Sequence, residues 1–204
     1  GIVHRLDRET SGVMVVAKND RAMKILANAI KDRRVSRLYL ALVIGEPEED
    51  AFTIEAPIGR DEHFRIKRAV DGVAAKDAVT HLRVLARENG FSLLRCQLET
   101  GRTHQIRVHC SQRRMPIAGD ELYGGTPERG LEKLRHADSV TRNAIRKLAR
   151  PFLHARTLRF RHPADNHWVT YAAPLPDDIR EVAETLFPET DLGAALAAGF
   201  DTDA

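Results

Sequence analysis

The strongest local constraint on this chain is an Asn-Gly pair, Asn89-Gly90, that separates two apolar runs. Residues 78–86 and 91–98 have the length and side-chain pattern of β-strands. Asn and Gly both tolerate the positive φ values that a tight hairpin turn requires. The sequence therefore predicts that these two strands are neighbours and run antiparallel.

Further strands and helices follow in an irregular order along the chain. Strands are predicted at residues 38–44, 52–58, 153–160 and 168–173, and a buried strand at residues 13–17, where every side chain is apolar. Helices are predicted after an Asp20 cap, over residues 105–112 after a Thr103 cap, and over residues 177–186. Residues 59–71 are expected to form an exposed loop or ribbon, and residues 126–150 a partly helical surface insertion.

The order of these elements indicates the fold class. Strands come in adjacent runs, and helices are interspersed without the regular alternation of a doubly wound parallel sheet. No Pro-, Gly- or Ser-rich linker divides the chain. We therefore expect one α+β domain with a mixed, mainly antiparallel sheet flanked by helices and loops.

Composition restricts the setting in which the chain works. No window reaches the roughly 18 uncharged apolar residues that a membrane-spanning helix needs, and no secretory signal follows Gly1. The two cysteines, Cys96 and Cys110, form neither a disulfide framework nor a Cys-x-x-Cys metal site. These features predict a cytoplasmic protein that does not contact a membrane.

Charge is distributed unevenly between the body of the chain and its tail. Residues 1–176 carry 31 basic and 21 acidic side chains, whereas residues 177–204 carry one basic and eight acidic ones. A basic body favours a polyanionic partner such as nucleic acid, because neutralised phosphates release counterions. The alternative is that the positive balance only maintains solubility.

Asp7 is the first residue with the surroundings of a reactive group. It lies between Arg5 and Arg8, in a loop that ends in Thr10-Ser11-Gly12. Neighbouring cations keep a carboxylate ionised, and an ionised carboxylate acts as a nucleophile or a base. The alternative is a loop-capping Asp that forms a surface ion pair.

A second candidate segment covers residues 99–109. Arg102 and Arg107 bring two guanidiniums to the beginning of the predicted helix, a favourable place for a phosphate or a carboxylate. The alternative is a cationic helix on a solvated face. His104 and His109 are five residues apart, off the i, i+4 spacing of a helical metal pair, and no third ligand is near, so no metal is predicted.

Tyr39 occupies an alternating position in the strand predicted at residues 38–44. Taken alone, a tyrosine at such a position is most often a core or interface residue.

Considered in order, the segments resemble the RluA-type pseudouridine synthases, most closely the branch that modifies large-subunit ribosomal RNA. The resemblance covers nearly all of residues 3–176. Its motifs are His-Arg-Leu-Asp-Arg-Glu-Thr-Ser-Gly at 4–12, Tyr-Leu-Ala-Leu-Val at 39–43, Leu-Glu-Thr-Gly-Arg-Thr-His-Gln-Ile-Arg-Val-His at 98–109, Pro-Ile-Ala-Gly-Asp at 116–120, Tyr-Gly at 123–124 and Leu-His-Ala at 153–155.

The resemblance implies isomerisation of uridine to pseudouridine in RNA, on a sheet with a central cleft and without cofactor or metal. Asp7 matches the family's catalytic aspartate, and Arg107 matches the arginine that pairs with it. Tyr39 matches the tyrosine that packs on the base and is the candidate for removal of the C5 proton. Arg5 matches the arginine that helps displace the target base, and Arg102 and His104 are expected to contact the RNA or the base.

Other hypotheses remain at this stage. Within the family, transfer RNA is the alternative substrate, and a noncatalytic RNA-binding or ribosome-assembly module is the alternative outside catalysis. A glycosidase is a further, weaker hypothesis. The protein is expected to be a monomer of one catalytic domain, residues 1–204, with an acidic helical tail at residues 177–204. We also expect it to lack the strand pair, and any S4 domain, that precede the first motif in family members.

Overall fold

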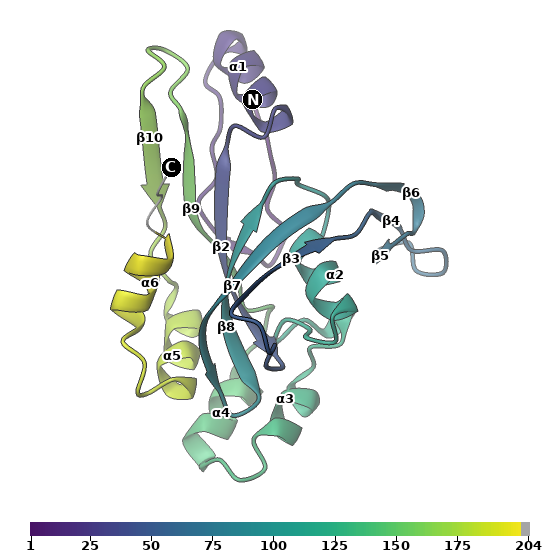
Figure 1. Cartoon of the computed structure of the whole chain (residues 1–204), viewed down its shortest axis with the longest axis vertical. Coiled ribbons are helices and arrows are strands. Elements are labelled where there is room, and N and C mark those ends of the chain that lie inside the picture. Colours follow the sequence, from purple (N-terminus) through teal and green to yellow (C-terminus); the bar gives the residue numbers. More distant parts are fainter. Residues whose placement is uncertain (201–204) are drawn as a thin grey trace.

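The computed structural model describes residues 1–200 as a long, twisted sheet with helices at its sides and ends (Figure 1). The main sheet has the strand order β1-β9-β2-β8-β7-β3, and β10 also pairs with β9. Only the contact between β1 and β9 is parallel. Its strands are β1 (Ser11–Gly12), β2 (Ser36–Ile44), β3 (Ala51–Glu55), β7 (Val79–Glu88), β8 (Phe91–Leu98), β9 (Leu153–Arg161) and β10 (Trp168–Ala172). The predicted α+β class with a mixed, mainly antiparallel sheet is confirmed.

The hairpin predicted from Asn89-Gly90 joins β7 to β8. Glu88 is paired with Phe91, so the two residues between them form the whole loop. Asn89 has φ 55° and Gly90 has φ 80°, which is the positive-φ pair that such a turn requires. The same register aligns Leu82, Cys96 and Tyr39 across β7, β8 and β2.

A second, smaller sheet confirms the exposed ribbon expected at residues 59–71. It has the order β5-β4-β6, with β4 (Ile58–Arg60) between β5 (Arg68–Val70) and β6 (Val73–Lys76). In Figure 1 this sheet extends sideways from the end of β3 and the start of β7. The strand expected at residues 52–58 is therefore divided, since β3 ends at Glu55 and β4 begins after Pro57.

The buried strand predicted at residues 13–17 is wrong. The regular strand here, β1, lies just before this run, and within the run only Val16 forms a bridge, to Ile2. Val13, Val15 and Ala17 pack towards α1 (Asp20–Lys31) and β9, whereas Met14 is 42% and Val16 53% exposed. An all-apolar run predicts burial on two faces, but α1 covers this segment on only one.

Two predicted helix caps are displaced by one residue. Asn19, not Asp20, caps α1, because its side chain accepts a hydrogen bond from the Ala22 amide. Helix α2 (Gln105–Gln112) has the predicted bounds, but its cap position is His104 with φ 60°, and Thr103 does not cap it. The Gln105 side chain turns back instead and accepts a hydrogen bond from the Arg102 amide.

Residues 126–150 are more than a surface insertion. They form α3 (Pro127–Lys133) and α4 (Ser139–Lys147), which lie at one end of the sheet (Figure 1). Leu134, Ile145 and Leu148 are buried in the main core. Gly130 allows this close packing, because a Cβ there would lie 2.8 Å from the Ile145 side chain and 3.4 Å from Phe91.

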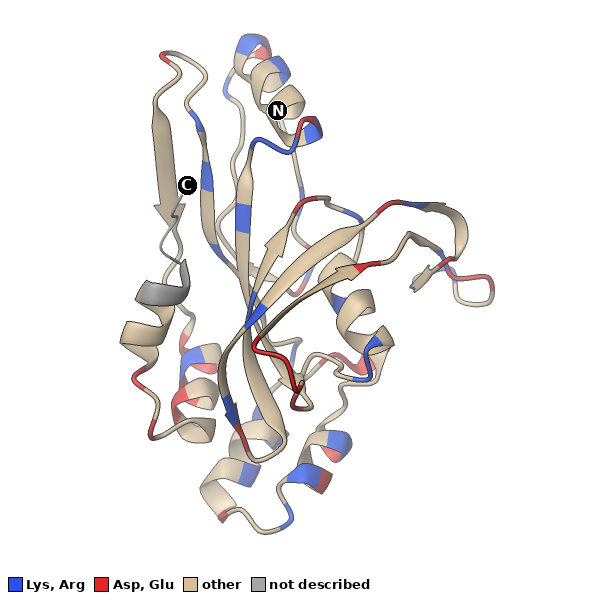
Figure 2. Cartoon of the chain, in the orientation of Figure 1, with Lys and Arg blue, Asp and Glu red and all other residues tan. Residues whose placement is uncertain are grey.

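The described part of the acidic tail forms two helices, joined by a turn at residues 187–191. Helix α5 (Asp177–Leu186) has the predicted bounds, and α6 (Leu192–Phe200) follows it. Asp177 and Asp178 occupy the first turn of α5, where negative charge is favourable. Figure 2 shows acidic residues around α5 and basic residues on α1, β2 and β9. Asp201 and Asp203, part of the predicted tail, lie outside the described residues.

No helix among residues 1–200 combines the length and apolar character needed to span a bilayer.

Candidate active site

A cavity of about 380 Å³ opens where the loop before β1 meets β2 and the loop between β8 and α2. The six residues singled out by the sequence come from these segments and from the first turn of α2, and all of them line the cavity: Arg5, Asp7, Tyr39, Arg102, His104 and Arg107. Antiparallel pairing of β2 with β8 brings the last two segments together, although about 60 residues separate them in the chain.

Asp7 lies in the loop that leads into β1. Its backbone carbonyl accepts a hydrogen bond from the Thr10 amide at 3.0 Å, which closes a turn. Its carboxylate is only 17% exposed and faces two side chains of the α2 region. Oδ2 lies 3.5 Å from Arg107 Nη1, and Oδ1 lies 4.0 Å from His104 Nε2. The cation that faces Asp7 is therefore Arg107, as the resemblance implied, and not its sequence neighbours Arg5 and Arg8.

Arg107 is held by a second carboxylate. Its Nε and Nη2 donate to the two oxygens of Asp120 at 2.7 and 2.8 Å, in a bidentate pair that is buried on both sides. Burial alone would lower the pKa of Arg107, but the hydrogen bonds and charge of Asp120 outweigh it and raise the pKa. The remaining nitrogen, Nη1, is directed at Asp7. Asp120 thus fixes the cation that faces the candidate catalytic carboxylate.

His104 connects Asp7 to Tyr123. The His104 Nδ1 lies 2.7 Å from the Tyr123 hydroxyl, which also accepts a hydrogen bond from the Arg68 amide at 2.9 Å. If the hydroxyl donates its proton to Nδ1, the ring proton lies on Nε2, which faces Asp7. Burial lowers the pKa of His104 and raises that of Tyr123 to about 12, so both rings are uncharged at neutral pH.

Tyr39 is part of the cavity wall and of the core at the same time. It is 7% exposed, at the β2 position paired with Cys96 and Ala155. Burial raises the pKa of its phenol, the Arg37 charge opposes that shift, and the Asp7 charge adds to it. Tyr39 is therefore a neutral phenol at pH 7.

Arg5 and Arg102 line the cavity without pairing with a carboxylate among residues 1–200. Arg5 is exposed to solvent. Arg102 donates from Nε to the carbonyl of Asp77 at 2.9 Å. Neither makes a hydrogen bond or ion pair with Asp7 in the described part of the chain, whereas Arg107 and His104 both lie within 4.0 Å of that carboxylate.

Sequence reasoning gave no role to Asp120 and Tyr123, although both lie in motifs that carried the resemblance. A compact turn presents them to α2: the Gly119 amide donates to Gly125 and the Gly125 amide to Asp120. Gly119 has φ 79°, and a Cβ there would lie 2.2 Å from the Arg150 carbonyl, so only glycine fits. The glycines that flank the two residues, Gly119 before Asp120 and Gly124 and Gly125 after Tyr123, were the signal that could have indicated this turn.

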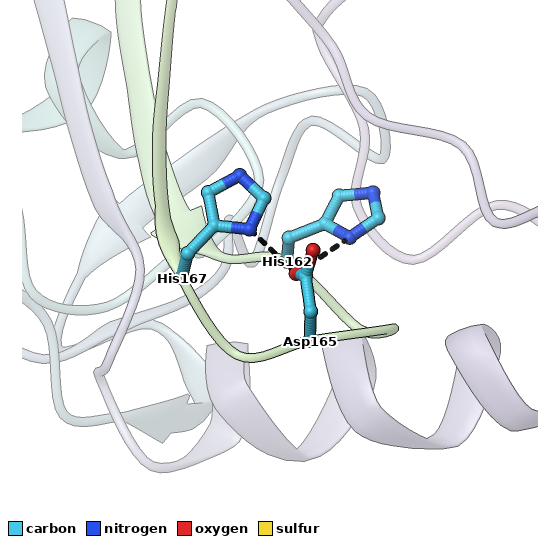
Figure 3. A group of neighbouring side chains, drawn as sticks. All are labelled: His162, Asp165 and His167. Atoms are coloured by element: carbon cyan, nitrogen blue, oxygen red, sulfur yellow. Dashed lines mark hydrogen bonds and ion pairs between the residues drawn. The ribbon is translucent and has the colours of Figure 1, made fainter.

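Metal ligands can be sought among the histidines. His109 does not serve, because Nδ1 is paired with Thr80 at 2.9 Å and Nε2 with the Ala56 carbonyl at 3.0 Å. Within the described chain, one group of three could hold an ion: His162, Asp165 and His167, at the turn between β9 and β10 (Figure 3). Asp165 Oδ1 lies 3.3 Å from His162 Nδ1 and 2.5 Å from His167 Nδ1. None of the three lines the Asp7 cavity.

The chemistry available in the cavity follows from these contacts. It holds a carboxylate fixed by one guanidinium N–H, a neutral phenol and several further cations. A carboxylate in this setting can attack or deprotonate a substrate that carries negative charge.

Comparison with known proteins assigns the family. The family described as RNA pseudouridylate synthase matches residues 1–112. Ribosomal large subunit pseudouridine synthase D of Neisseria meningitidis is 44% identical over 97% of this chain and 51% of its own length. The protein of the same name from Xanthomonas campestris is 42% identical over 97% of this chain and 58% of its own length.

A solved structure agrees with the sequence relatives. Human RNA Pseudouridylate Synthase Domain Containing 1 superposes with a TM-score of 0.65 and 33% identity, over 85% of this chain and 68% of that one. The fold is thus that of an RNA pseudouridylate synthase domain. The chain belongs to the RNA pseudouridylate synthase family, and the RluA-type resemblance is confirmed. It spans about half the length of the curated relatives it matches.

Proposed function

We propose that this protein isomerises uridine to pseudouridine in large-subunit ribosomal RNA, with Asp7 as the catalytic carboxylate and without a cofactor. The observation that carries the proposal is the Asp7–Arg107–Asp120 arrangement. It directs one ionised carboxylate into a basic cavity beside a neutral tyrosine. The names of the ribosomal relatives support the choice of substrate.

The reaction breaks the bond between uracil N1 and ribose C1′ and forms a bond between uracil C5 and C1′. The Asp7 carboxylate either attacks C1′ or removes a proton from C2′ to give a glycal, and Arg107 holds it in place for both routes. The released uracil turns within the cavity and presents C5 to the sugar. As C5 bonds to C1′, Asp7 leaves C1′ or returns the proton to C2′. C5 then loses its proton and N1 takes one up, so no atom is gained or lost overall.

Tyr39 is the residue proposed to pack on the base and to accept the proton from C5. Its ring forms part of the cavity wall, where a uracil can pack on it. Because burial raises the pKa of the phenol, Tyr39 must pass on its own proton before it accepts the one from C5. The uracil N1, which gains a proton in the net reaction, is the acceptor for that transfer.

The remaining cavity residues are assigned to the RNA. A stacked uridine must leave its helix to reach Asp7, at a cost of a few kcal/mol. Exposed Arg5 can take the place of the displaced base, and Arg102 and His104 are proposed contacts to the RNA or the base. Loops and bulges, where unstacking costs least, are the expected targets. We also propose that residues 1–204 act as one catalytic domain, as a cytoplasmic monomer, with residues 177–204 as a tail outside the site.

The test is release of tritium from C5 of labelled RNA. The wild-type protein is expected to release tritium from large-subunit ribosomal RNA, and Asp7→Asn to release none above background. Asp20→Asn, at the exposed start of α1, is the matched control and should behave as wild type. Undiminished release by Asp7→Asn would contradict the assigned mechanism.

Parallel reactions on transfer RNA test the choice of substrate. Release from transfer RNA alone would replace the ribosomal assignment by the transfer RNA one. Full biological rescue by Asp7→Ala would instead favour a noncatalytic RNA-binding role, and free uracil among the products would indicate a glycosidase.

A further inference from the structure

Arg37 lies beside the catalytic groups but has no part in the mechanism above. It is two residues from Tyr39 in β2, so both side chains project from the same face of the strand, and both line the Asp7 cavity. Arg37 is 6% exposed, which is unusual for an arginine without a charged partner.

The fold makes room for this guanidinium without satisfying it. A Cβ on Gly101 would lie 2.5 Å from Arg37 Nη1, so the absence of a side chain at residue 101 provides its space. Nη2 makes one long hydrogen bond, 3.3 Å, to the Glu99 carbonyl. Nε is buried and has no hydrogen-bond partner, and no carboxylate among residues 1–200 forms an ion pair with Arg37.

Arg107, the other buried arginine of the cavity, differs from Arg37 because it has a carboxylate partner. Arg107 has the bidentate carboxylate of Asp120, and its pKa is raised. Burial lowers the pKa of Arg37, because its charge is removed from water without compensation. Both residues line the same cavity, so a ligand that enters it can reach the uncompensated cation as well.

None of three groups near Arg37 offers it a free negative charge. The partner that it lacks is therefore an anion. His4 carries no negative charge, and its Nε2 accepts a hydrogen bond from the Val15 amide. The nearby Tyr39 is a neutral phenol. The Glu99 carboxylate is occupied by Arg33 and His81. A planar guanidinium suits a phosphate, whose oxygens accept two parallel hydrogen bonds.

We propose that Arg37 binds a backbone phosphate of the RNA, next to the uridine that enters the cavity. This inference rests on the proposed function, because RNA supplies the anion. It assigns Arg37 to substrate binding, and it gives Gly101 the task of admitting the guanidinium.

The test combines one substitution with one change in the RNA. Arg37→Met removes the charge but retains the length of the side chain. It is expected to weaken RNA binding about 10- to 100-fold, the size of a lost hydrogen bond to a charged group. Its thermal unfolding midpoint should not fall, because an uncompensated cation is removed from the interior. Arg83→Met, at an exposed position of β7 outside the cavity, is the control and should retain affinity.

The RNA partner of Arg37 is identified by replacing single phosphates near the target uridine with uncharged methylphosphonate. The wild type is expected to lose about 10- to 100-fold in affinity at one of these positions, and Arg37→Met to lose nothing further there. Equal losses for both proteins at every position would overturn the inference, as would a large fall in the unfolding midpoint of Arg37→Met without loss of affinity.

Binding and catalysis are measured separately on the same RNAs. If the wild type forms pseudouridine but shows no coupling between Arg37 and a phosphate, the inference fails and the proposed function remains. If the coupling is found but no pseudouridine forms, Arg37 binds RNA as inferred and the proposed function fails.

Discussion

The Arg107 guanidinium is shared between two carboxylates, with Asp120 on its Nε and Nη2 at 2.7 and 2.8 Å and Asp7 on its Nη1 at 3.5 Å. The shorter, buried, bidentate pair with Asp120 fixes the side chain, and the longer contact leaves Asp7 free to react. One carboxylate of the pair, Asp120, therefore stabilises Arg107, and the other, Asp7, is the one proposed to react.

This division predicts opposite consequences for the two aspartates. Asp120→Asn leaves the buried Arg107 charge without its main partner, and we expect the free energy of unfolding to fall by about 3–5 kcal/mol. Asp7→Asn leaves the Arg107–Asp120 pair intact, so its stability should stay close to that of the wild type. Urea denaturation of the two variants measures the difference.

The activity of Asp120→Asn gives a second test of the Arg107–Asp120 pair. In Asp120→Asn the Arg107 side chain is no longer fixed, and a misplacement near 1 Å costs about 100-fold in kcat. Equal stability of Asp120→Asn and Asp7→Asn would contradict the positioning role of Asp120.

Tyr39→Phe separates the packing of Tyr39 from its proton chemistry. The ring is retained, so the free energy of unfolding should change by no more than about 1 kcal/mol. Loss of the hydroxyl should lower kcat by about 100- to 10,000-fold, the range of general acid–base catalysis. Single-turnover assays with tritiated RNA measure the step. A kcat within a factor of two of wild type would assign Tyr39 to packing alone.

The parts of the fold that the sequence predicts well are those that one segment determines by itself. The hairpin at Asn89-Gly90 needs positive φ at two consecutive residues, and few residue types allow that. The predicted burial of residues 13–17 failed because burial depends on which elements cover a segment, and here α1 covers one face only. The cap of α1 was predicted one residue too late, because Asn19 and Asp20 are both good capping residues.

Some residues of the candidate site could likewise be predicted from the sequence, and others could not. Asp7, Tyr39 and Arg107 were identified because the order of their motifs resembles a known family. Asp120 could not be assigned a role, because its partner lies 13 residues away and is reached only through the turn around Gly119. Arg37 was also missed, since the sequence alone does not reveal that its guanidinium is buried without a carboxylate.

Buried neutral histidines predict an acid-sensitive fold. Burial lowers the pKa of His109, whose nitrogens are paired with Thr80 and the Ala56 carbonyl. The unfolded chain binds a proton near pH 6.5 while the folded chain does not, so stability is present above pH 6.5 and falls as the pH drops through the lowered value. Urea midpoints between pH 7.5 and 5 should decrease, and less steeply in His109→Gln. His136→Gln, at an exposed position, should keep the wild-type slope. An unchanged slope in His109→Gln would remove His109 as the cause.

Arg150 is predicted to position the Asp7 loop from outside the cavity. Its Nη1 donates to the Glu9 carbonyl at 3.1 Å and to the Ser11 hydroxyl at 3.2 Å, while Nε and Nη2 bind Asp178 of α5 at 2.7 and 3.0 Å. Ser11 is tied in turn to the buried ring of His154 at 2.9 Å.

Arg150→Met removes all four of these hydrogen bonds and leaves the cavity residues themselves unchanged. We expect kcat to fall by about 10- to 100-fold through misplacement of Asp7, with little change in KM for RNA. Asp178→Asn should reproduce a smaller part of the loss, because Arg150 then loses the carboxylate that orients it. Arg146→Met is the matched control, since Arg146 is exposed on α4 and its guanidinium donates to Asn143 in the same helix. A rise in KM at constant kcat would instead place Arg150 among the RNA contacts.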